Sequence, residues 1–584
     1  MLGCLGGVQP PSREASAARR SSESGVGGPP RFKQGDVLRK HAPLLAILAV
    51  AVLPYFVGLQ SSTIWDANEA YYAETPREMI ESGDYVNPTF NYQPRFNKPV
   101  LSYWTVAASY HLFGVSERSE RLPIAVSAVV LVATAYVLGW AAWSREAGLL
   151  AALVLATTPR FLMFSRRIII DMWITMFTGL TLLCFVLAEL RPDHRRRYLG
   201  LMYVAAGLGV LTKGPIALVL PALAILIYLG VERRLAYLTR MMIPAGIVIV
   251  SLIVVPWYLA LYAQHGWVYI REFFIDENVL RYAQPVGAAR RGVLFYVPVL
   301  LTDLFPWSLL LPVAFGSAWT AFAEAASATV ANWNRVQRIL LIWIATIVLF
   351  FTFSQTKEDL YIFPAVAAEA ALIGVVLERA REGERLRGVA VRWSFIVAGA
   401  LVSLIGIGLF ALSLSGTQYQ VAGTRAVAVI AVAGGAQALT AAWRRQLRTG
   451  ALGLASAFAA MSWVFVLVSL PDFERYKPVA PLVQIIKQRA APHARIGYYR
   501  FAMPSMAFYL RRPVFEYFDP ESVQSVFASG DEVHCLMTAE DYGVVKDLLG
   551  PTYVVARKPL FDVKIQSLVE GSALSDILMV STKP

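Results

Sequence analysis

Two carboxylates stand three residues apart where the first apolar segment of the chain gives way to a long polar stretch. On a helical turn this spacing places Asp66 and Glu69 on one face. A carboxylate held at a membrane surface can take the proton from a hydroxyl or amine that attacks a substrate. We therefore predict that Asp66 and Glu69 form the catalytic base or orient an acceptor. The alternative is a solvated loop end whose acids only cap the chain.

A second group of candidates follows in the run RRIIID at residues 166–171. Arginine binds phosphate through a planar set of N–H donors, so Arg166 and Arg167 are predicted to hold an anionic group. Asp171 is predicted to be a further catalytic carboxylate. The spacing of Arg167 and Asp171 equally allows a simple salt bridge across one helical turn.

Three lysines and a tyrosine complete the predicted anion site. Lys98 lies in the polar stretch that follows Asp66, and Lys213 lies in a short turn between two apolar segments. Lys357 belongs to the run SQTKEDLY, which also supplies Tyr361. A cation beside a leaving phosphate stabilises the charge that develops in the transition state. The alternative for each lysine is snorkelling, in which the apolar stem lies in lipid and the ammonium group reaches the interface.

The composition indicates which elements must position these residues. Hydrophobic residues make up 57% of the 584-residue chain, and charged residues make up 16%. Soluble proteins carry about 25% charged residues. Charged side chains are costly in lipid, and backbone polar groups there must bond to one another. The sequence therefore predicts an all-α polytopic membrane protein. Its net charge of +13 is carried in short loops and requires no nucleic-acid partner.

Apolar segments long enough to cross a bilayer occur about thirteen times along residues 39–470. They lie near residues 42–59, 121–143, 148–164, 171–190, 198–212, 214–231, 241–263, 293–316, 338–354, 360–377, 393–413, 425–443 and 452–470. Arginine and lysine concentrate in alternate connections, from Arg39 and Lys40 to Arg444 and Arg445, which indicates that these connections are cytoplasmic. The N-terminus is therefore predicted to lie inside and the C-terminus outside.

Two of the predicted outer connections are long, residues 60–120 and 264–292. The first is expected to contain short amphipathic helices on the membrane surface, such as Ala73–Ser82. The second carries Glu277 and Arg281 among other polar residues, and we expect it to close over a cavity.

The two ends of the chain differ in composition from the apolar segments. Residues 1–38 are rich in Ser, Gly, Pro and Arg and are predicted to form a disordered cytoplasmic tail. Residues 471–584 are predicted to form a small extracytoplasmic α/β domain that acts as a lid or scaffold. Its predicted helices are 478–489 and 539–549, and its predicted strands are 496–499, 532–537, 553–556 and 577–581.

The first outer connection carries a specific resemblance to a known family. The run NEAYYAETPREM, then SGDYV, KP and YW, followed by LFG and RLP, resembles the lipid-A aminoarabinose transferases. Those enzymes are related to the protein O-mannosyltransferases. The resemblance also includes the segments around Arg167, Lys213 and Lys357. It implies a GT-C glycosyltransferase fold, a polyprenyl-phosphate-sugar donor, inverting transfer and a catalytic aspartate in the first outer connection.

Two positions depart from the pattern of this family. Asn68 stands where the family has the aspartate of an Asp-Glu pair, so Asp66 is expected to replace it. Asn97 stands where the aminoarabinose enzymes have a glutamate associated with metal binding, so a divalent metal, although not excluded, is not expected. The six histidines show no metal-ligand spacing either.

These observations predict an inverting glycosyltransferase of the inner membrane. It would move a sugar from a polyprenyl-phosphate donor to an extracytoplasmic acceptor, which is a glycolipid like lipid A, a glycan or a protein. One alternative is a transporter or flippase of lipids or lipid-linked sugars, although the chain has no Walker A sequence for ATP-driven transport. The other alternative is a non-catalytic scaffold for envelope assembly.

Overall fold

The computed structural model describes residues 34–66, 68–284, 291–323, 332–381, 385–414, 420–560 and 575–584. Two compact units make up the chain, Met1–Ala46 and Ile47–Pro584. The described part of the first unit is the beginning of helix α2 (Gln34–Val52). Residues 1–33 of the predicted tail therefore lie outside the described residues, and residues 34–38 begin a helix.

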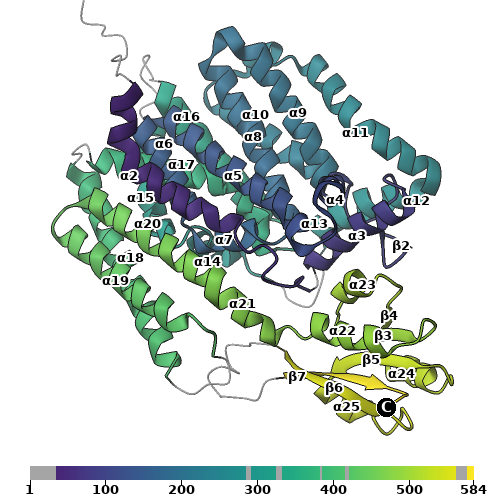
Figure 1. The fold of residues 1–584 in the computed structure, drawn as a ribbon. Coiled ribbons are helices and arrows are strands. Elements are labelled where there is room, and N and C mark those ends of the chain that lie inside the picture. Colours follow the sequence, from purple (N-terminus) through teal and green to yellow (C-terminus); the bar gives the residue numbers. More distant parts are fainter. Residues whose placement is uncertain are drawn as a thin grey trace, which may run out of the picture. The chain divides into compact units, whose positions relative to one another are not determined.

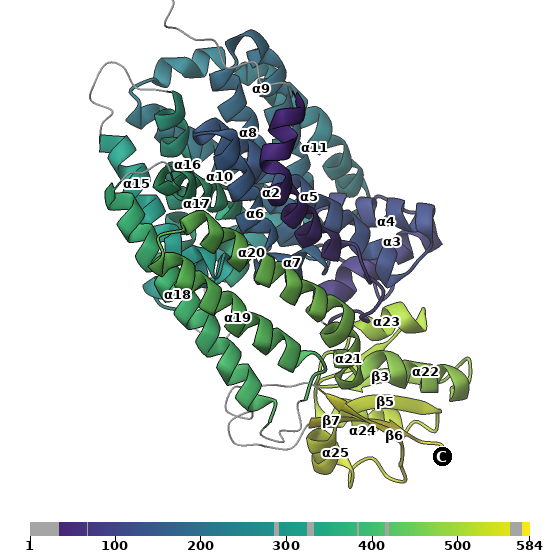
Figure 2. The same ribbon diagram turned by 60° about the vertical axis from the view of Figure 1, so that its left-hand side comes forward.

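Eight helices among the described residues are long and apolar enough to cross a membrane. They involve α5 (Glu117–Ala142), α8 (Ile170–Leu190), α11 (Ile243–His265), α16 (Asn332–Thr352), α17 (Val366–Arg381), α18 (Arg385–Leu412), α19 (Thr424–Trp443) and α20 (Leu447–Val464). Short turns extend two of them, namely η8 (Asp359–Ala365) before α17, and η9 (Phe465–Ser469), α21 (Leu470–Phe473) and η10 (Glu474–Tyr476) after α20. Figure 2 shows α18, α19 and α20 side by side.

Two further pairs of helices form bent crossings. Helices α6 (Arg145–Ala156) and α7 (Pro159–Ser165) meet at 70°, and the segments Val293–Asp303 and Trp307–Thr320 meet at 112°. A proline follows each break, and proline lacks the N–H that would continue the preceding helix. The second pair is built from η5 (Val293–Phe295), α14 (Tyr296–Asp303), η6 (Trp307–Leu310) and α15 (Leu311–Ala323).

The remaining helices of this part are shorter or more polar. They are η1 (Leu53–Tyr55), η2 (Pro192–His194), α9 (Arg195–Lys213), α10 (Ile216–Val231) and η3 (Leu235–Arg240). Each apolar segment predicted from the sequence overlaps a helix, which confirms the all-α membrane fold. Within the described ranges, eight helices or up to ten with the bent pairs have the length and composition of a crossing. The count of about thirteen crossings is therefore not confirmed and stays a prediction.

Local sequence signals set the helix ends that matter for the site. Ser116 caps α5, since its side chain accepts the N–H of Ser119 at 3.2 Å. This cap fixes Arg121 in the second turn of α5. Gly214 ends α9 with a φ of 86°, a conformation that glycine adopts without strain. The chain turns there directly into α10 and leaves Lys213 as the last residue of α9.

Both long outer connections contain regular structure. The first holds α3 (Asn68–Ser82), the small hairpin of β1 (Thr89–Phe90) and β2 (Gln93–Pro94), and α4 (Leu101–Phe113). Residues 73–82 are helical as predicted, within a helix that begins at Asn68. Most of its side chains are buried, so its amphipathic character and its place on the membrane surface stay predictions. The second holds α12 (Trp267–Ile270), the π-helix η4 (Arg271–Leu280) and α13 (Arg281–Ala283). Residues 285–290 of this predicted connection lie outside the described residues.

The last part of the chain is built around a five-stranded sheet with the order β4-β3-β5-β7-β6. Strand β3 is parallel to β4 and β5, whereas β7 is antiparallel to β5 and β6. The strands are β3 (Arg495–Tyr499), β4 (Phe515–Tyr517), β5 (Val533–Thr538), β6 (Tyr553–Leu560) and β7 (Ser575–Ser581). The four predicted strands are therefore confirmed. The short edge strand β4 was not predicted, because three residues carry too little alternation to stand out.

Alternating side chains give this sheet two apolar faces. Leu536 and Met579 lie in a core with α22 (Val479–Arg489) and α23 (Ser505–Leu510), whereas Cys535 and Val580 lie in a second core. The second core includes α24 (Pro520–Phe527) and α25 (Ala539–Val545). Figure 1 shows α22 and α25 on opposite sides of the sheet. The predicted α/β character of the C-terminal part is thereby confirmed.

Close packing of α17 against α6 depends on a glycine. A Cβ atom on Gly374 would lie 2.4 Å from the carbonyl oxygen of Ala147, which is backbone and cannot move aside alone. We expect Gly374→Ala to force the two helices apart and to lower the free energy of unfolding by about 1–3 kcal/mol. Thermal unfolding of the purified protein in detergent measures this change. Gly408→Ala in α18 is the matched control, because no atom lies within 4 Å of its Cβ position. Equal melting temperatures for the two variants would contradict the expectation.

Candidate functional site

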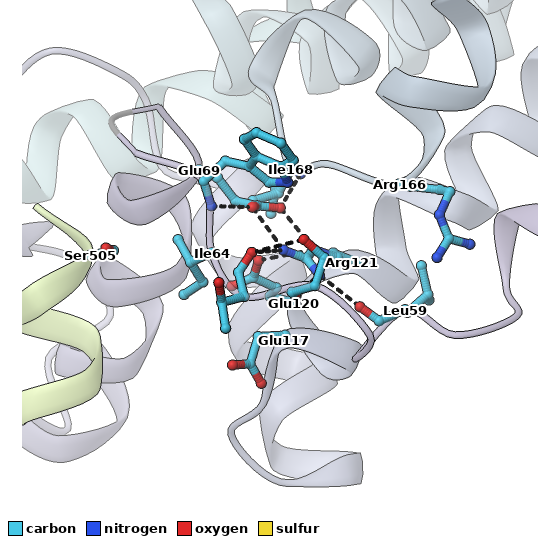
Figure 3. A network of polar contacts seen from close by, with 12 residues as sticks. Leu59, Ile64, Glu69, Glu117, Glu120, Arg121, Arg166, Ile168 and Ser505 are labelled. Atoms are coloured by element: carbon cyan, nitrogen blue, oxygen red, sulfur yellow. Dashed lines mark hydrogen bonds and ion pairs between the residues drawn. The ribbon is translucent and has the colours of Figure 1, made fainter. Parts of the chain in front are cut away.

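The first outer connection begins with a loop that closes around one buried arginine (Figure 3). Arg121 donates through Nη1 to the carbonyl oxygens of Leu59 at 2.7 Å and Ser62 at 2.6 Å. Its Nη2 donates to the carbonyl oxygen of Thr63 at 3.1 Å. A loop lacks a regular ladder for its carbonyl groups, and a buried carbonyl without a partner is costly. The guanidinium satisfies three carbonyl groups at once and thereby fixes the path of the loop.

Glu69 completes this buried network. Its Oε1 accepts from Arg121 Nε at 2.9 Å, and its Oε2 accepts from Arg121 Nη2 at 2.8 Å. The same carboxylate accepts the backbone N–H of Trp65 at 2.8 Å and that of Ile168 at 3.2 Å. Burial would raise the pKa of Glu69, but Arg121 and then Arg167 outweigh burial and lower the pKa to about 2. A carboxylate with this pKa and four donors is a weak base, so the geometry favours a positioning role over the predicted catalytic role.

Asp66 is directed toward the C-terminal part of the chain. Its Oδ1 accepts the backbone N–H of Ser505 at 2.7 Å, and its Oδ2 accepts Ser505 Oγ at 2.7 Å. Burial raises the pKa of Asp66 to about 6, although both Ser505 bonds and the charge of Lys477 act in the opposite direction. Both carboxylate oxygens are thus engaged by the start of α23. The predicted role of Asp66 as the base would require these bonds to break.

Further contacts clamp the same loop to the C-terminal part. Glu474 accepts Ser62 Oγ at 2.7 Å through Oε1, and it accepts Thr63 N at 2.9 Å and Oγ1 at 2.7 Å through Oε2. The ring of Trp65 stacks on Phe473 with centroids 5.5 Å apart. Residues separated by about 400 positions in sequence therefore build one loop conformation.

Three of the predicted phosphate ligands come together elsewhere with Arg281. Lys213 Nζ lies 5.3 Å above the ring of Tyr361 and pairs with Asp171. Arg281 Nε donates to the hydroxyl of Tyr361 at 3.0 Å. Lys98 Nζ pairs with Glu277 at 2.9 Å, and the same Glu277 oxygen accepts from Arg281 Nη1 at 3.1 Å. We call these six residues, Lys98, Asp171, Lys213, Glu277, Arg281 and Tyr361, the cation cluster.

The three cations of this cluster influence one another electrostatically. Burial lowers the pKa of Lys98, Glu277 opposes this effect, and the positive charges of Lys213 and Arg281 lower the pKa further. The side chains of Lys98 and Lys213 are 20% and 18% exposed, so an anion can reach them. Such a group of cations suits a phosphate, which accepts charge-assisted hydrogen bonds from lysine and arginine.

The structure does not bring the other predicted cations into this cluster. Arg166 donates to the carbonyl oxygens of Pro54, Val57 and Gly58, and these contacts occupy both of its terminal nitrogens. Arg166 therefore shapes the chain before the first outer connection, and its contacts do not support the predicted phosphate role.

Arg167 and Lys357 also make their contacts outside the cation cluster. The guanidinium of Arg167 lies 4.9 Å from the ring centroid of Trp65, next to the Arg121 network. Within the described part of the chain, Asp171 pairs with Lys213 and not with Arg167, so the simple salt bridge considered from the sequence does not form. Lys357 Nζ donates to the carbonyl oxygen of Ser354 in its own segment and is buried. Neither contact supports the predicted phosphate role.

Sequence reasoning gave no site role to Arg121, Glu277 or Arg281. Arg121 belongs to the RLP run that carried the family resemblance, which was the available signal for it. Glu277 and Arg281 stand four residues apart in the second outer connection, a spacing that pairs opposite charges on a helix. That spacing could have linked the second connection to the predicted anion site.

The described residues around the cation cluster do not form a recognisable metal site. Asn97 donates through Nδ2 to Glu277 Oε1 at 3.3 Å, so an amide stands beside the cluster and brings no charge to it. Among the described residues, no group of three or more His, Cys, Asp or Glu side chains is arranged to hold a metal ion. The expectation about metal dependence stays a prediction.

Comparisons with known proteins show which families the chain is similar to. Residues 97–259 match the family described as dolichyl-phosphate-mannose-protein mannosyltransferase. Proteins named undecaprenyl phosphate-alpha-4-amino-4-deoxy-L-arabinose arabinosyl transferase are 30% identical in Pectobacterium carotovorum subsp. carotovorum (strain PC1) and 31% identical in Pseudomonas aeruginosa (strain LESB58). The first alignment covers 62% of this chain and 65% of the relative, slightly less than two thirds of it. The second covers 73% and 75%.

A solved structure has the same fold along nearly the whole chain. The ArnT protein of Cupriavidus metallidurans, crystallised with undecaprenyl phosphate, matches with a TM-score of 0.74 at 23% sequence identity. The match covers 92% of this chain and 98% of that chain, so it includes the C-terminal sheet as well as the helices.

The Arg121 network predicts a large effect of one substitution. Arg121→Met removes the charge that compensates Glu69 and leaves three loop carbonyl groups without a donor. Breaking a buried ion pair from one side costs about 3–5 kcal/mol, so we expect a correspondingly lower free energy of unfolding. Thermal unfolding of the purified protein measures the loss. Arg118→Met is the control, because Arg118 is exposed in the first turn of the same helix. A loss no larger than that of the control would show that the network does not stabilise the fold.

The raised pKa of Asp66 predicts that the stability difference between wild type and an Asp66→Asn variant depends on pH. Its pKa is raised from 3.8 to about 6 in the folded protein, so the folded state binds the proton more tightly than the unfolded state. The contribution of Asp66 to the free energy of unfolding therefore falls as pH rises from about 4 to about 6. Asp66→Asn imitates the protonated acid, and its melting temperature relative to wild type should be higher at pH 8 than at pH 5. Melting temperatures recorded at both pH values test this, and a difference that does not change with pH would contradict it.

Proposed function

Because this chain belongs to the family of the undecaprenyl phosphate-aminoarabinose arabinosyl transferases, we propose that it transfers a sugar from a polyprenyl-phosphate carrier to an acceptor outside the cytoplasm. The chain is a multi-pass membrane protein with the GT-C fold. The observation that carries the proposal is the convergence of Lys98, Lys213 and Arg281 beside Tyr361 and a carboxylate that can act as a base.

The cation cluster holds the phosphate of the donor lipid. The acceptor oxygen or nitrogen forms a bond to the anomeric carbon of the sugar while the bond from that carbon to the phosphate oxygen breaks. The electron pair of the broken bond stays on the phosphate, so negative charge grows there as the reaction proceeds. Lys98, Lys213 and Arg281 stabilise this growing charge. A single displacement of this kind inverts the configuration at the anomeric carbon.

We assign Asp171 as the base that takes the proton of the attacking acceptor group. Asn68 cannot accept a proton, Asp66 is engaged by Ser505, and Glu69 is saturated by four donors. Asp171 lies in the first turn of α8, pairs with Lys213 and is 15% exposed. When the donor phosphate binds Lys213, this carboxylate is released from its ion pair and can take the proton of the acceptor.

The relatives give the most direct indication of the substrates. Their name specifies 4-amino-4-deoxy-L-arabinose carried on undecaprenyl phosphate, and we propose the same donor for this chain. The acceptor is a glycolipid of the lipid A type, with a glycan or a protein as the other classes that the assay must include. An amine or hydroxyl of any of these acceptors meets the same requirement for a base.

The protein is proposed to lie in the inner membrane with its N-terminus in the cytoplasm. The alternation of basic residues in the connections supports this orientation. The C-terminal sheet then lies on the outer side, because Ser505 binds Asp66 and the N–H of Val514 donates to Asn91 Oδ1 at 2.8 Å. Both partners belong to the first outer connection, so the sheet and that connection share one side of the membrane.

The proposal is tested by transfer from a panel of undecaprenyl-phosphate sugars by purified protein in lipid nanodiscs. We expect wild type to transfer aminoarabinose to lipid A. Asp171→Asn removes the base, so we expect it to lower kcat by a factor of about 10²–10⁴. Asp66→Asn should keep most of the activity, because Asp66 serves the contact with Ser505.

A matched control is Asp193→Asn, the same change at an exposed aspartate of η2. This variant should transfer at the rate of wild type. If Asp66→Asn abolishes transfer while Asp171→Asn does not, Asp66 is the base and the assignment is wrong. If wild type binds the donors but releases no sugar from any of them, the proposed activity fails and a transporter or scaffold takes its place.

A further inference from the structure

Glu277 occupies the position among the cations that a phosphate would need. Its Oε2 accepts from Lys98 Nζ at 2.9 Å and from Arg281 Nη1 at 3.1 Å. Its Oε1 accepts from Asn97 Nδ2 at 3.3 Å. These donors are the ones that a bound phosphate would draw on, because carboxylate and phosphate oxygens accept the same charge-assisted hydrogen bonds.

The net charge of the cluster does not favour the Glu277 carboxylate and a lipid phosphate being bound to the cations at the same time. Three cations, Lys98, Lys213 and Arg281, face two carboxylates, Asp171 and Glu277. Burial would raise the pKa of Glu277, but Lys98 and Arg281 outweigh burial and hold the pKa below its usual value, so the carboxylate is charged at neutral pH. The donor lipid carries one negative charge as a phosphodiester. The released lipid is a phosphate monoester with a charge of about −1.5 to −2, so the second anion meets stronger repulsion after transfer than before it.

The element that carries Glu277 is of a kind that is frequent at functional sites. Helix η4 is a π-helix of ten residues, and π-helical turns are rare and occur frequently at functional sites. It packs against the turn that carries Lys213, since a Cβ atom on Gly214 would lie 2.5 Å from the ring of Phe273. The two segments that carry Lys213 and Glu277 are therefore in direct contact.

We infer that Glu277 is a resident counter-ion that holds Lys98 and Arg281 in the absence of lipid and exchanges places with the phosphate of the lipid. This inference rests on the proposed function. Before the donor binds, the carboxylate keeps the two cations paired and oriented. The phosphate displaces it on binding, and after transfer the carboxylate competes with the more highly charged phosphate monoester and promotes its release.

The opposing explanation is that Glu277 only anchors Lys98 and Arg281. The two explanations predict effects of opposite sign. If Glu277 competes with phosphate, its removal strengthens binding of the lipid phosphate. If Glu277 only anchors the cations, its removal lets them move and weakens binding.

The test measures the Kd of undecaprenyl phosphate for the full chain in nanodiscs at several salt concentrations. Glu277→Gln keeps the shape of the side chain and removes its charge. We expect it to bind undecaprenyl phosphate about two- to fivefold more tightly than wild type, the change that loss of one partly exposed ion pair allows. The affinity of the variant should also fall more steeply with salt, because its site carries one more net positive charge. In single-turnover transfer the variant should form product, and in multiple turnover it should slow at product release.

Glu272→Gln is the matched control, since Glu272 is exposed on the same helix. We expect its affinity to equal that of wild type. Glu277→Ala is a second variant, because it removes the carboxylate without adding an amide, and it should act in the same direction as Glu277→Gln. Weaker or unchanged binding by a folded Glu277 variant, while wild type binds and transfers normally, overturns the inference alone. Failure of wild type to bind undecaprenyl phosphate overturns the proposed function and the inference with it.

Discussion

The buried guanidinium of Arg121 is bound at the same time to a carboxylate and to three loop carbonyl oxygens. Removing one arginine from water is costly, and the cost is met only when nearly every donor finds a partner of good geometry. Glu69 provides the charge, and the loop provides the remaining acceptors. The same carboxylate also receives the N–H of Ile168, two residues before the start of α8. One ion pair therefore links the first outer connection, α5 and the segment that leads to Asp171.

The cation cluster is assembled differently, from the ends of separate elements. Lys213 is the last residue of α9, Asp171 lies in the first turn of α8, and Arg281 begins α13. Helix ends that are fixed by packing can hold like charges near one another, which an unsupported loop could not do against their repulsion. The carboxylates of Asp171 and Glu277 reduce this repulsion. The fixed helix ends and the internal counter-ions thus both lower the free-energy cost of holding the three cations near one another.

Much of the fold could be predicted from the sequence, because lipid imposes a simple rule on composition and segment length. The helices and four of the five strands of the sheet followed from hydrophobic runs and alternation. Lys98, Lys213, Asp171 and Tyr361 were also predicted as site residues, and the structure brings them into one cluster, whose role as a site stays a prediction.

What could not be predicted depends on contacts between distant segments. No local pattern shows that Glu69 faces Arg121 or that Asp66 receives both donors of Ser505, 439 positions away. Arg166 looked like a phosphate ligand for the same reason, because its carbonyl partners at Pro54 and Val57 carry no side-chain signal. The sequence indicates where charged groups lie along the chain, and the tertiary structure decides which of them are already neutralised.

The contact between Glu474 and the loop at Ser62 and Thr63 joins residues 412 and 411 positions apart, and this has a consequence for biosynthesis. At ribosomal speeds of about 5–20 residues per second, the loop waits roughly 20–80 s for its partner to be made. During that time most of the helices have been inserted, yet the loop has no acceptor for Ser62 and Thr63 and no stacking partner for Trp65. This surface of the nascent protein is therefore completed only when the last segment of the chain arrives. A prematurely terminated chain would carry the cations of the cluster without the loop in its final form.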